Sequence, residues 1–221
     1  MAPYRSSSNK NETRLYAVAE CQGGFFTAKQ AETAGYVRNN HAYHVQSGKW
    51  ERHYPGIFRL THYPLSEHRD LILWSLWSRD QNDVPQGVFS HQTALSINDL
   101  SDLMPSKLHM TVPRKFRKGS KIPAILRLHF ADLAPHEILE RAGYRITRPI
   151  KTILDLIDAQ EISDDLIVQG FSEARERGLI TEREVRIYRD RLLPVLSSLE
   201  EIGNEKSSKT VCHSRSFSHS T

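Results

Sequence analysis

The sequence predicts an α+β protein, with an N-terminal winged helix-turn-helix followed by a mixed α/β C-terminal domain and a disordered tail. Two short helical patterns and a hairpin pattern follow one another within residues 22–63. Helical and strand-like segments then alternate through residues 64–200. Residues 201–221 are rich in serine and poor in apolar side chains. We therefore expect domains at residues 12–63 and 64–200 and a disordered tail at 201–221.

The first domain is expected to open with two helices. Residues 12–21 place apolar side chains at helical spacing and predict the first one. Thr27, followed three residues later by Gln30, is a capping-box pattern that starts the second helix at about Ala28. Gly35 stands where a glycine can take the left-handed conformation that ends a helix.

A third helix is predicted after a short connection. Asn39 or Asn40 can cap it, and it runs to about Ser47 with Ala42 and Val45 turned inward. The outward side chains are then hydrogen-bond donors, acceptors and cations, namely Arg38, Asn40, His41, Tyr43 and His44.

A hairpin follows this helix. Residues 49–54 and 57–60 are strand-forming, and Pro55-Gly56 between them suits a type II turn. Residues 1–64 carry eight Lys or Arg against four Glu, and a positive surplus fits a polyanionic partner. Modules of this kind also serve in dimerisation and protein docking, so the pattern alone leaves DNA binding and protein binding open.

The second domain is predicted to mix helices and strands. An apolar helix capped by Asp70 is expected, and Pro135 begins another that ends near Gly143. Strands are expected at 108–112, 125–130 and 144–147, a short strand running into helical turns at 88–104, and helices at 150–159, 163–177 and 181–199.

A basic loop lies between two of these strands. Arg114, Lys115, Arg117 and Lys118 cluster around Phe116, with Lys121 close behind. Such a loop can contact a nucleic acid or a protein partner, or it can simply be solvated.

The sequence holds no motif for catalysis, a metal or a cofactor. Ser90, His91 and Asp99 could be drawn as a hydrolytic group, but no GxSxG elbow surrounds the serine, and neighbours in the chain are expected to point apart. No HExxH motif or cysteine pair accompanies the eleven histidines. We expect no enzyme activity, no metal and no cofactor.

The composition favours a cytoplasmic protein without membrane contact. No apolar run approaches the roughly 20 residues that span a bilayer, and the first residues lack the apolar core of a secretory signal. Cys21 is expected on the apolar side of the first helix and Cys212 in the tail, so no structural disulfide is predicted.

Several stretches, taken together in order, resemble the AbiEi family of antitoxins. They are GGFFTAKQAETAGY, YPGIFRLTHYP, GVFSHQTALSINDLSDLMPSKLHMTVP and RAGYRITRPIKTILDLIDA, and the resemblance spans roughly residues 12–195. It implies an antitoxin of a type IV toxin-antitoxin system. The winged helix would repress its own operon on double-stranded operator DNA with inverted repeats, and the C-terminal domain would neutralise a nucleotidyltransferase-like toxin, with or without direct contact.

The resemblance also implies which residues hold DNA. They lie on the third helix and the wing: Arg38, Asn39, Asn40, His41, Tyr43, His44, Lys49, Arg52, His53 and Tyr54. The antitoxin surface has no such motif, and Arg114, Lys115, Arg117 and Lys118 are candidates only through their charge. The alternatives are a stand-alone winged-helix regulator of transcription and a protein-interaction module that never touches DNA.

Overall fold

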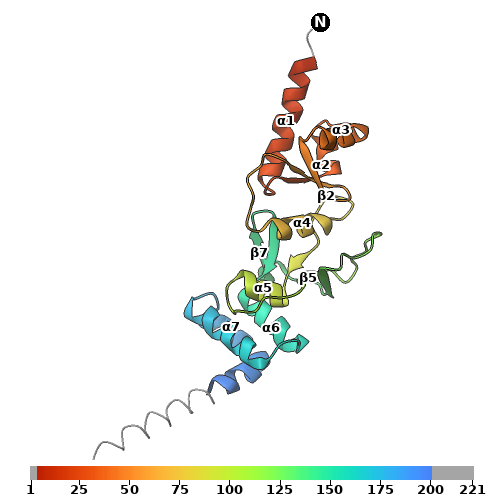
Figure 1. Cartoon of the computed structure of the whole chain (residues 1–221). Helices are drawn as coiled ribbons and strands as arrows, with labels where there is room; N and C mark the ends of the chain where they lie inside the picture. The colour runs from red at the N-terminus through yellow and green to blue at the C-terminus, as the bar shows by residue number, and fades with distance from the viewer. Residues whose placement is uncertain (1–3, 201–221) are drawn as a thin grey trace, which may run out of the picture. The chain divides into compact units, whose positions relative to one another are not determined.

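The structure is a computed structural model that describes residues 4–200, with side chains from residue 9 onward (Figure 1). The fold is mixed α+β, so this part of the expected fold class is confirmed. The predicted tail at 201–221, including Cys212, lies outside the described residues. None of the described helices is both long enough and apolar enough to cross a membrane.

The described chain divides into two compact units. The first contains the described residues up to Phe89 together with Met110–Ile122 and Leu128–Ile146. The second contains Ser90–His109, Pro123–Arg127 and the described residues from Thr147 onward. The domain boundary expected between residues 63 and 64 stays a prediction.

The first unit begins with helices that pack against a three-stranded antiparallel sheet of order β1-β3-β2. Phe26 faces Phe58 across β1 and β3, and Trp50 pairs with Leu60 across β2 and β3. Phe26, Trp50 and Phe58 pack with Leu15 into one core. The elements are α1 (Tyr4–Glu20), β1 (Phe25–Thr27), α2 (Ala28–Thr33), the 3-10 turn η1 (Arg38–Asn40), α3 (His41–Gln46), β2 (Trp50–Tyr54) and β3 (Ile57–Leu60).

Local signals place α2 and the hairpin turn as expected. The Thr27 hydroxyl accepts from the Gln30 amide at 3.1 Å, and the Gln30 side chain accepts from the Thr27 amide at 2.8 Å, which completes the capping box. Gly35 and Gly56 both have positive φ, at 103° and 75°. Glycine is the residue that takes such a backbone at little cost.

The first helix differs from the prediction. It begins at Tyr4 and not near residue 12, because no glycine or proline interrupts the polar segment before it. It also ends at Glu20, so Cys21 is exposed in the following turn and does not lie on the apolar side of the helix.

Helix α4 (Arg69–Trp77) is the apolar helix expected after residue 64, and it contacts β1 and β3. Its N-cap is His68, whereas Asp70 lies within the first turn, so the predicted Asp70 cap is wrong. The helix buries Leu71, Ile72, Leu73, Ser75, Leu76 and Trp77.

A second sheet has five strands in the order β6-β5-β4-β8-β7. Its strands are β4 (Val88–Phe89), β5 (Leu108–Val112), β6 (Leu126–Phe130), β7 (Ile138–Arg141) and β8 (Tyr144–Thr147). Strand β4 pairs antiparallel with β5 and parallel with β8.

The predicted helix after Pro135 is wrong. Only a 3-10 turn forms at Pro135–Glu137, and the chain then becomes β7, which neighbours β8 in the sheet. Gly143, at φ 84°, turns between the two strands. Pairing with β8 overrides the local helical preference of this segment, because strand formation depends strongly on what lies alongside.

The second unit is mainly helical. Its helices are α5 (His91–Ile97), α6 (Pro149–Ala159), α7 (Asp164–Glu176) and α8 (Glu182–Ile187), close to the predicted positions. The capping box of Thr181 and Glu184 starts α8 as expected. Helix α8 does not continue unbroken toward Leu199, because Tyr188 interrupts it before helical residues 189–200. The core includes Leu95, Leu100, Ile153, Leu154, Leu156, Ile167, Phe171 and Leu192.

Candidate nucleic-acid interface

An aromatic cluster centred on Trp50 fixes α3 against the small sheet. The Trp50 side chain is 3% exposed. Its ring centre lies 4.9 Å from that of Phe26, 5.0 Å from Tyr36 and 4.6 Å from His44. Because α3 is only six residues long, this packing, more than its own hydrogen bonds, holds it in place.

The inward face of α3 is not the predicted one. His41 is 5% exposed and packs on Trp50 and Phe58, whereas Ala42 is exposed. The 3-10 turn η1 precedes the helix and shifts its phase, so that His41, His44 and Val45 face the sheet. His41 is therefore removed from the candidate DNA contacts.

His44 is half-buried and stacks on Trp50, so it was also wrongly expected to point outward. Burial lowers the pKa of the His44 ring, and the nearby charges of Lys49 and His41 lower it further. A neutral ring stacked on an indole is a packing group.

The exposed side of η1 and α3 carries a short set of polar and aromatic side chains. The Arg38 side chain is 80% exposed and its only ion pair among the described residues is a long one of 3.8 Å to Glu32. Asn39 and Asn40 are exposed, and neither caps the helix with its side chain, contrary to expectation. Tyr43 is 65% exposed. These side chains remain free to meet a ligand.

The hairpin is short, and its tip is fixed to its own unit. The Gly56 carbonyl accepts a hydrogen bond from the Ala28 amide at 2.9 Å. Lys49 and Arg52 are exposed. His53 is exposed, but its ring meets Glu51 at 3.2 Å and the edge of Phe25.

Tyr54 is half-buried against Trp74 and is less available than Arg52. The candidate DNA contacts that remain are the exposed residues around α3 and β2, namely Arg38, Asn39, Asn40, Tyr43, Lys49 and Arg52.

Two further cations on α1 were not predicted as contacts. Lys10 and Arg14 are exposed and lie four residues apart, so they share one side of the helix. The Asn11 amide on the same helix donates to the Gly35 carbonyl at 3.0 Å, which ties α1 to the turn before α3. The i, i+4 spacing of the two cations was visible in the sequence, but the helix was expected to start after Lys10.

One cation of the basic loop, Lys118, is half-buried and used internally, whereas the other four are exposed. Lys118 donates to the Arg79 carbonyl at 2.8 Å and lies 5.6 Å from the Trp77 ring centre, and burial lowers its pKa. Arg117 donates to the Phe116 carbonyl at 2.8 Å. Phe116 is half-buried, with its ring 6.1 Å from that of Trp77. Arg114, Lys115, Arg117 and Lys121 are exposed.

The Ser90 and His91 side chains do meet, contrary to the expectation that they point apart. Their Oγ and Nδ1 atoms lie 2.9 Å from each other. Ser90 is fully buried and His91 is 8% exposed, so a substrate would not reach the serine. Within residues 4–200, no group of three or more His, Cys, Asp or Glu side chains is placed to hold a metal ion.

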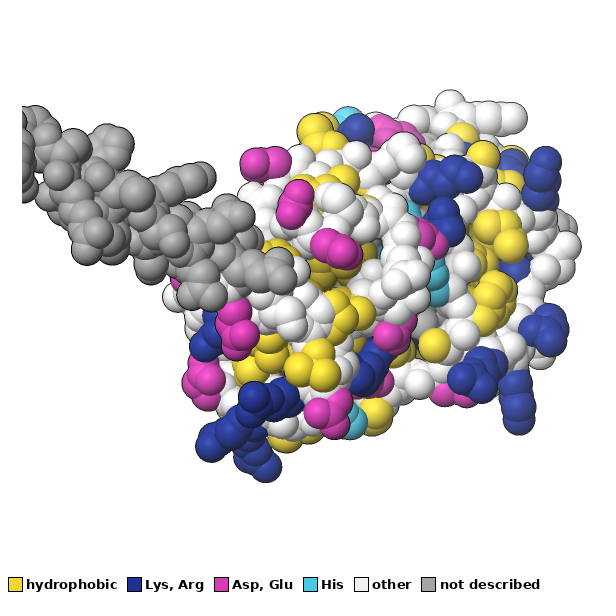
Figure 2. Space-filling model, turned by 90° about the horizontal axis from the view of Figure 1, so that it is seen from below, with side chains coloured by type: hydrophobic (Ala, Val, Ile, Leu, Met, Phe, Trp, Pro, Cys, Tyr) yellow, Lys and Arg dark blue, Asp and Glu magenta, His cyan; other side chains and the backbone are white. Residues whose placement is uncertain are grey.

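Ion pairs neutralise part of the positive charge on the described surface of the second unit. Several of its arginines pair with carboxylates, as Arg191 does with Asp158 at 2.5 Å. Exposed apolar side chains include Met104, Ile187 and Leu193. In one view of the molecule, acidic, basic and apolar side chains are interspersed (Figure 2).

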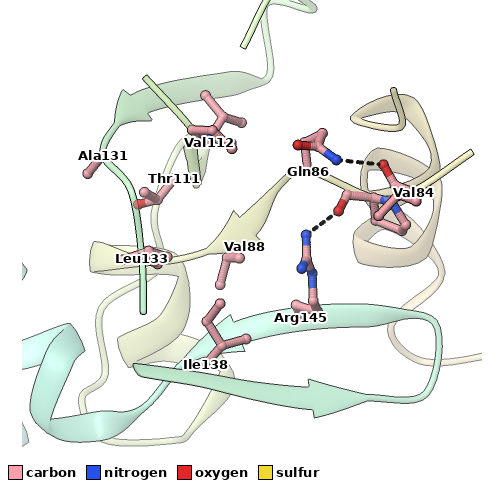
Figure 3. A pocket seen from close by; sticks show the side chains of 11 residues that line it. Val84, Gln86, Val88, Thr111, Val112, Ala131, Leu133, Ile138 and Arg145 are labelled. Atoms are coloured by element: carbon pink, nitrogen blue, oxygen red, sulfur yellow. Dashed lines mark hydrogen bonds between the residues drawn. The ribbon is translucent and has the colours of Figure 1, made fainter. Parts of the chain in front are cut away.

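A mainly apolar cavity of about 150 Å³ lies in the first unit (Figure 3). Val88, Ile138 and Leu133 line it, and Arg145 stands at one side with a hydrogen bond to the Pro85 carbonyl (Figure 3). Burial lowers the pKa of the Arg145 guanidinium. Sequence reasoning missed this arginine, because its burial arises from strands and loops far apart in the chain.

Comparisons with known proteins add little. No protein-family model matches the chain, and no curated protein matches it at a significant level. Among solved structures, the crystal structure of the RV2827C protein from Mycobacterium tuberculosis is similar over 73% of this chain and 71% of that one. The sequence identity is 11% and the TM-score is 0.45. No conclusion about function follows from a similarity of this size.

Proposed function

We propose that the N-terminal segment is a winged helix-turn-helix that binds double-stranded DNA. The observation that carries the proposal is an exposed set of side chains on two successive elements: Arg38, Asn39 and Asn40 on η1, and Tyr43 on α3, the helix that the Trp50 cluster fixes. Arginine and asparagine are the side chains that read guanine and adenine edges in the major groove. Lys49 and Arg52 lie close by in sequence, where a recognition helix is followed by its wing, and they are suited to phosphate.

The full proposal is an antitoxin of a type IV toxin-antitoxin system that represses its own operon and neutralises a nucleotidyltransferase-like toxin. This part rests on the resemblance to the AbiEi family. In it the first segment reads the operator, and residues 64–200 carry the neutralising activity.

The DNA proposal is tested by gel shift with the DNA upstream of the gene. We expect Arg38→Ala combined with Arg52→Ala to lose most of the operator affinity without loss of folding, since both side chains are exposed. Arg183→Ala, on an exposed face of α8, is the matched control and should bind normally. Unchanged binding by the double variant would reject the residue assignment.

The antitoxin proposal is tested by growth. A strain expressing the nucleotidyltransferase-like product of the adjacent gene should grow only when this chain is co-expressed. The variant Arg38→Ala with Arg52→Ala should still restore growth while losing repression of an operator reporter, which separates the two activities. If no such neighbouring gene exists, or if co-expression does not restore growth, the antitoxin proposal is rejected. A stand-alone regulator of transcription is then the better proposal.

A second candidate function is protein docking by the same face. Val37 is 63% exposed and Tyr43 65% exposed beside Arg38, and exposed aromatic and arginine side chains are typical of protein interfaces. Binding to DNA should weaken steeply as salt rises, because counterions are released from the phosphates. A shallow salt dependence with no preference for operator sequence favours docking.

A further inference from the structure

A second cavity of the first unit, of about 370 Å³, is lined by charged and polar groups that DNA binding does not use. Its walls come from residues after α1, from α4, from Val84-Pro85 and from the β7–β8 hairpin. The titratable and hydroxyl side chains in it are Cys21, Ser75, Arg79, Glu140, Arg141, Tyr144 and Arg145.

Ser75 presents a buried hydroxyl that lacks a partner. The residue is 1% exposed, and its Oγ makes no hydrogen bond to any described residue. Burying a hydroxyl without a hydrogen-bond partner is unfavourable, because the group loses its bonds to water and gains none in return. A hydrogen-bond acceptor in the cavity that Ser75 lines would offset that cost.

Arg79 and Arg145 are each anchored at one end only. Arg79 Nη2 donates to the Gln22 side-chain oxygen, and Arg145 Nη2 donates to the Pro85 carbonyl. The Nε atoms of both are buried without a partner among the described residues. Burial lowers the pKa of both guanidinium groups, because it removes water that would stabilise their charge. A bound anion would replace part of that lost stabilisation.

The charge balance of the cavity favours an anion. Three arginines and one carboxylate, Glu140, line it, and the carboxylate of Asp83 acts on Arg79 from outside the lining, so the arginines remain in excess. Guanidinium groups present planar forks of donors that match phosphate oxygens two at a time. Together with the Ser75 hydroxyl they offer more donors than the two oxygens of one carboxylate can accept.

We propose that this cavity binds a small phosphate-bearing molecule, with Arg79, Arg145 and Ser75 contacting the phosphate from inside and Arg141 from the exposed rim. Its size is within the range of small-ligand sites. This inference does not depend on the proposed function, because none of the residues involved is among the candidate DNA contacts.

Cys21 supplies the test, because it is exposed and lines the same cavity. The experiment uses the full chain carrying Cys212→Ser, so that Cys21 is the one cysteine left. The rate of alkylation of Cys21 is measured at increasing concentrations of inorganic phosphate, adenosine 5′-monophosphate or citrate, with the ionic strength kept constant by NaCl. A bound ligand slows alkylation by the factor 1 + [L]/Kd, about elevenfold at ten times Kd. Protection by phosphate alone identifies a free-anion site, and stronger protection by the monophosphate identifies a phosphate ester.

Two variants decide whether the assigned residues carry the binding. We expect Ser75→Ala and Arg141→Gln each to weaken protection about tenfold, as loss of a hydrogen bond to a charged group implies. The control variant Arg183→Gln, on α8, should leave the protection of Cys21 unchanged. Arg141 is exposed, so its variant should fold even if Ser75→Ala does not. Three results would overturn the proposal: citrate protecting as well as phosphate, no protection beyond that of NaCl, or variants protected as well as the protein that carries only Cys212→Ser.

Discussion

Trp50→Ala should destabilise the first unit more than any substitution on the exposed side of α3. The indole is 3% exposed and meets the rings of Phe26, Tyr36, His41 and His44 at centre distances of 4.6–5.3 Å. Truncating a buried tryptophan to alanine costs about 3–5 kcal/mol. With a urea m-value of about 1.5 kcal/mol/M, the unfolding midpoint should fall by about 2–3 M.

Tryptophan fluorescence reports this unit selectively. All three tryptophans of the chain, Trp50, Trp74 and Trp77, belong to the first unit, and two remain in the variant. Far-UV circular dichroism follows the helices of both units, so in the variant its transition should gain an early step at the midpoint that fluorescence reports.

Trp50→Phe is the matched control, since it keeps an aromatic ring in the cluster and should shift the midpoint by less than half as much. A shift under about 0.5 M for Trp50→Ala would refute the reasoning, because the cluster would then not be what fixes α3. DNA binding should be lost in Trp50→Ala together with folding, whereas Arg38→Ala should lose binding alone.

Three further outcomes follow from the structure. Burial holds the pKa of His44 below its usual 6.5 in the folded state, so the unfolded chain takes up a proton first as the pH falls. The free energy of unfolding should therefore be highest above pH 6.5 and decrease below it. We expect His44→Phe to flatten the dependence of the urea midpoint on pH between about 7.5 and 5.0. Arg59 is 3% exposed and its guanidinium donates to the Tyr63 and Pro64 carbonyls, so Arg59→Met should cost about 1–3 kcal/mol in urea unfolding followed by fluorescence, and an unchanged midpoint would contradict that. Thr181→Ala should lower the stability of the second unit by about 1 kcal/mol, measured by circular dichroism, with Thr181→Ser close to normal.

Local signals in the sequence were sufficient to predict α2 and the hairpin turn. Thr27 and Gln30 interact within one helical turn, and the positive φ of Gly56 depends on its own backbone. The phase of α3 could not be predicted in this way, because the 3-10 turn before it moved His41 to the inside. Strand β7 was missed for a related reason, since it is a strand only where β8 lies beside it.

One buried and two half-buried arginines were the largest omission at the candidate sites. Arg59, Arg79 and Arg145 look in the sequence like surface charges, and nothing local distinguishes them from Arg52. Their burial depends on carbonyl and amide oxygens supplied by other segments, such as Pro64, Gln22 and Pro85. Composition therefore predicted the sign of the charge but not which cations reach solvent.

The distinction between buried and exposed cations limits how strongly one protomer can hold DNA. Around α3 and β2, Arg38, Lys49 and Arg52 are the exposed cations among the described residues, whereas Arg59 is bonded internally. Each neutralised phosphate contributes about −0.9 to the slope of log K against log salt. Three cations give a slope of about −3, and two protomers on an inverted repeat give about −5. A measured slope near −5 that returns to −3 on a half-site would support paired binding, and a slope near −3 on both DNAs would show that one protomer binds alone.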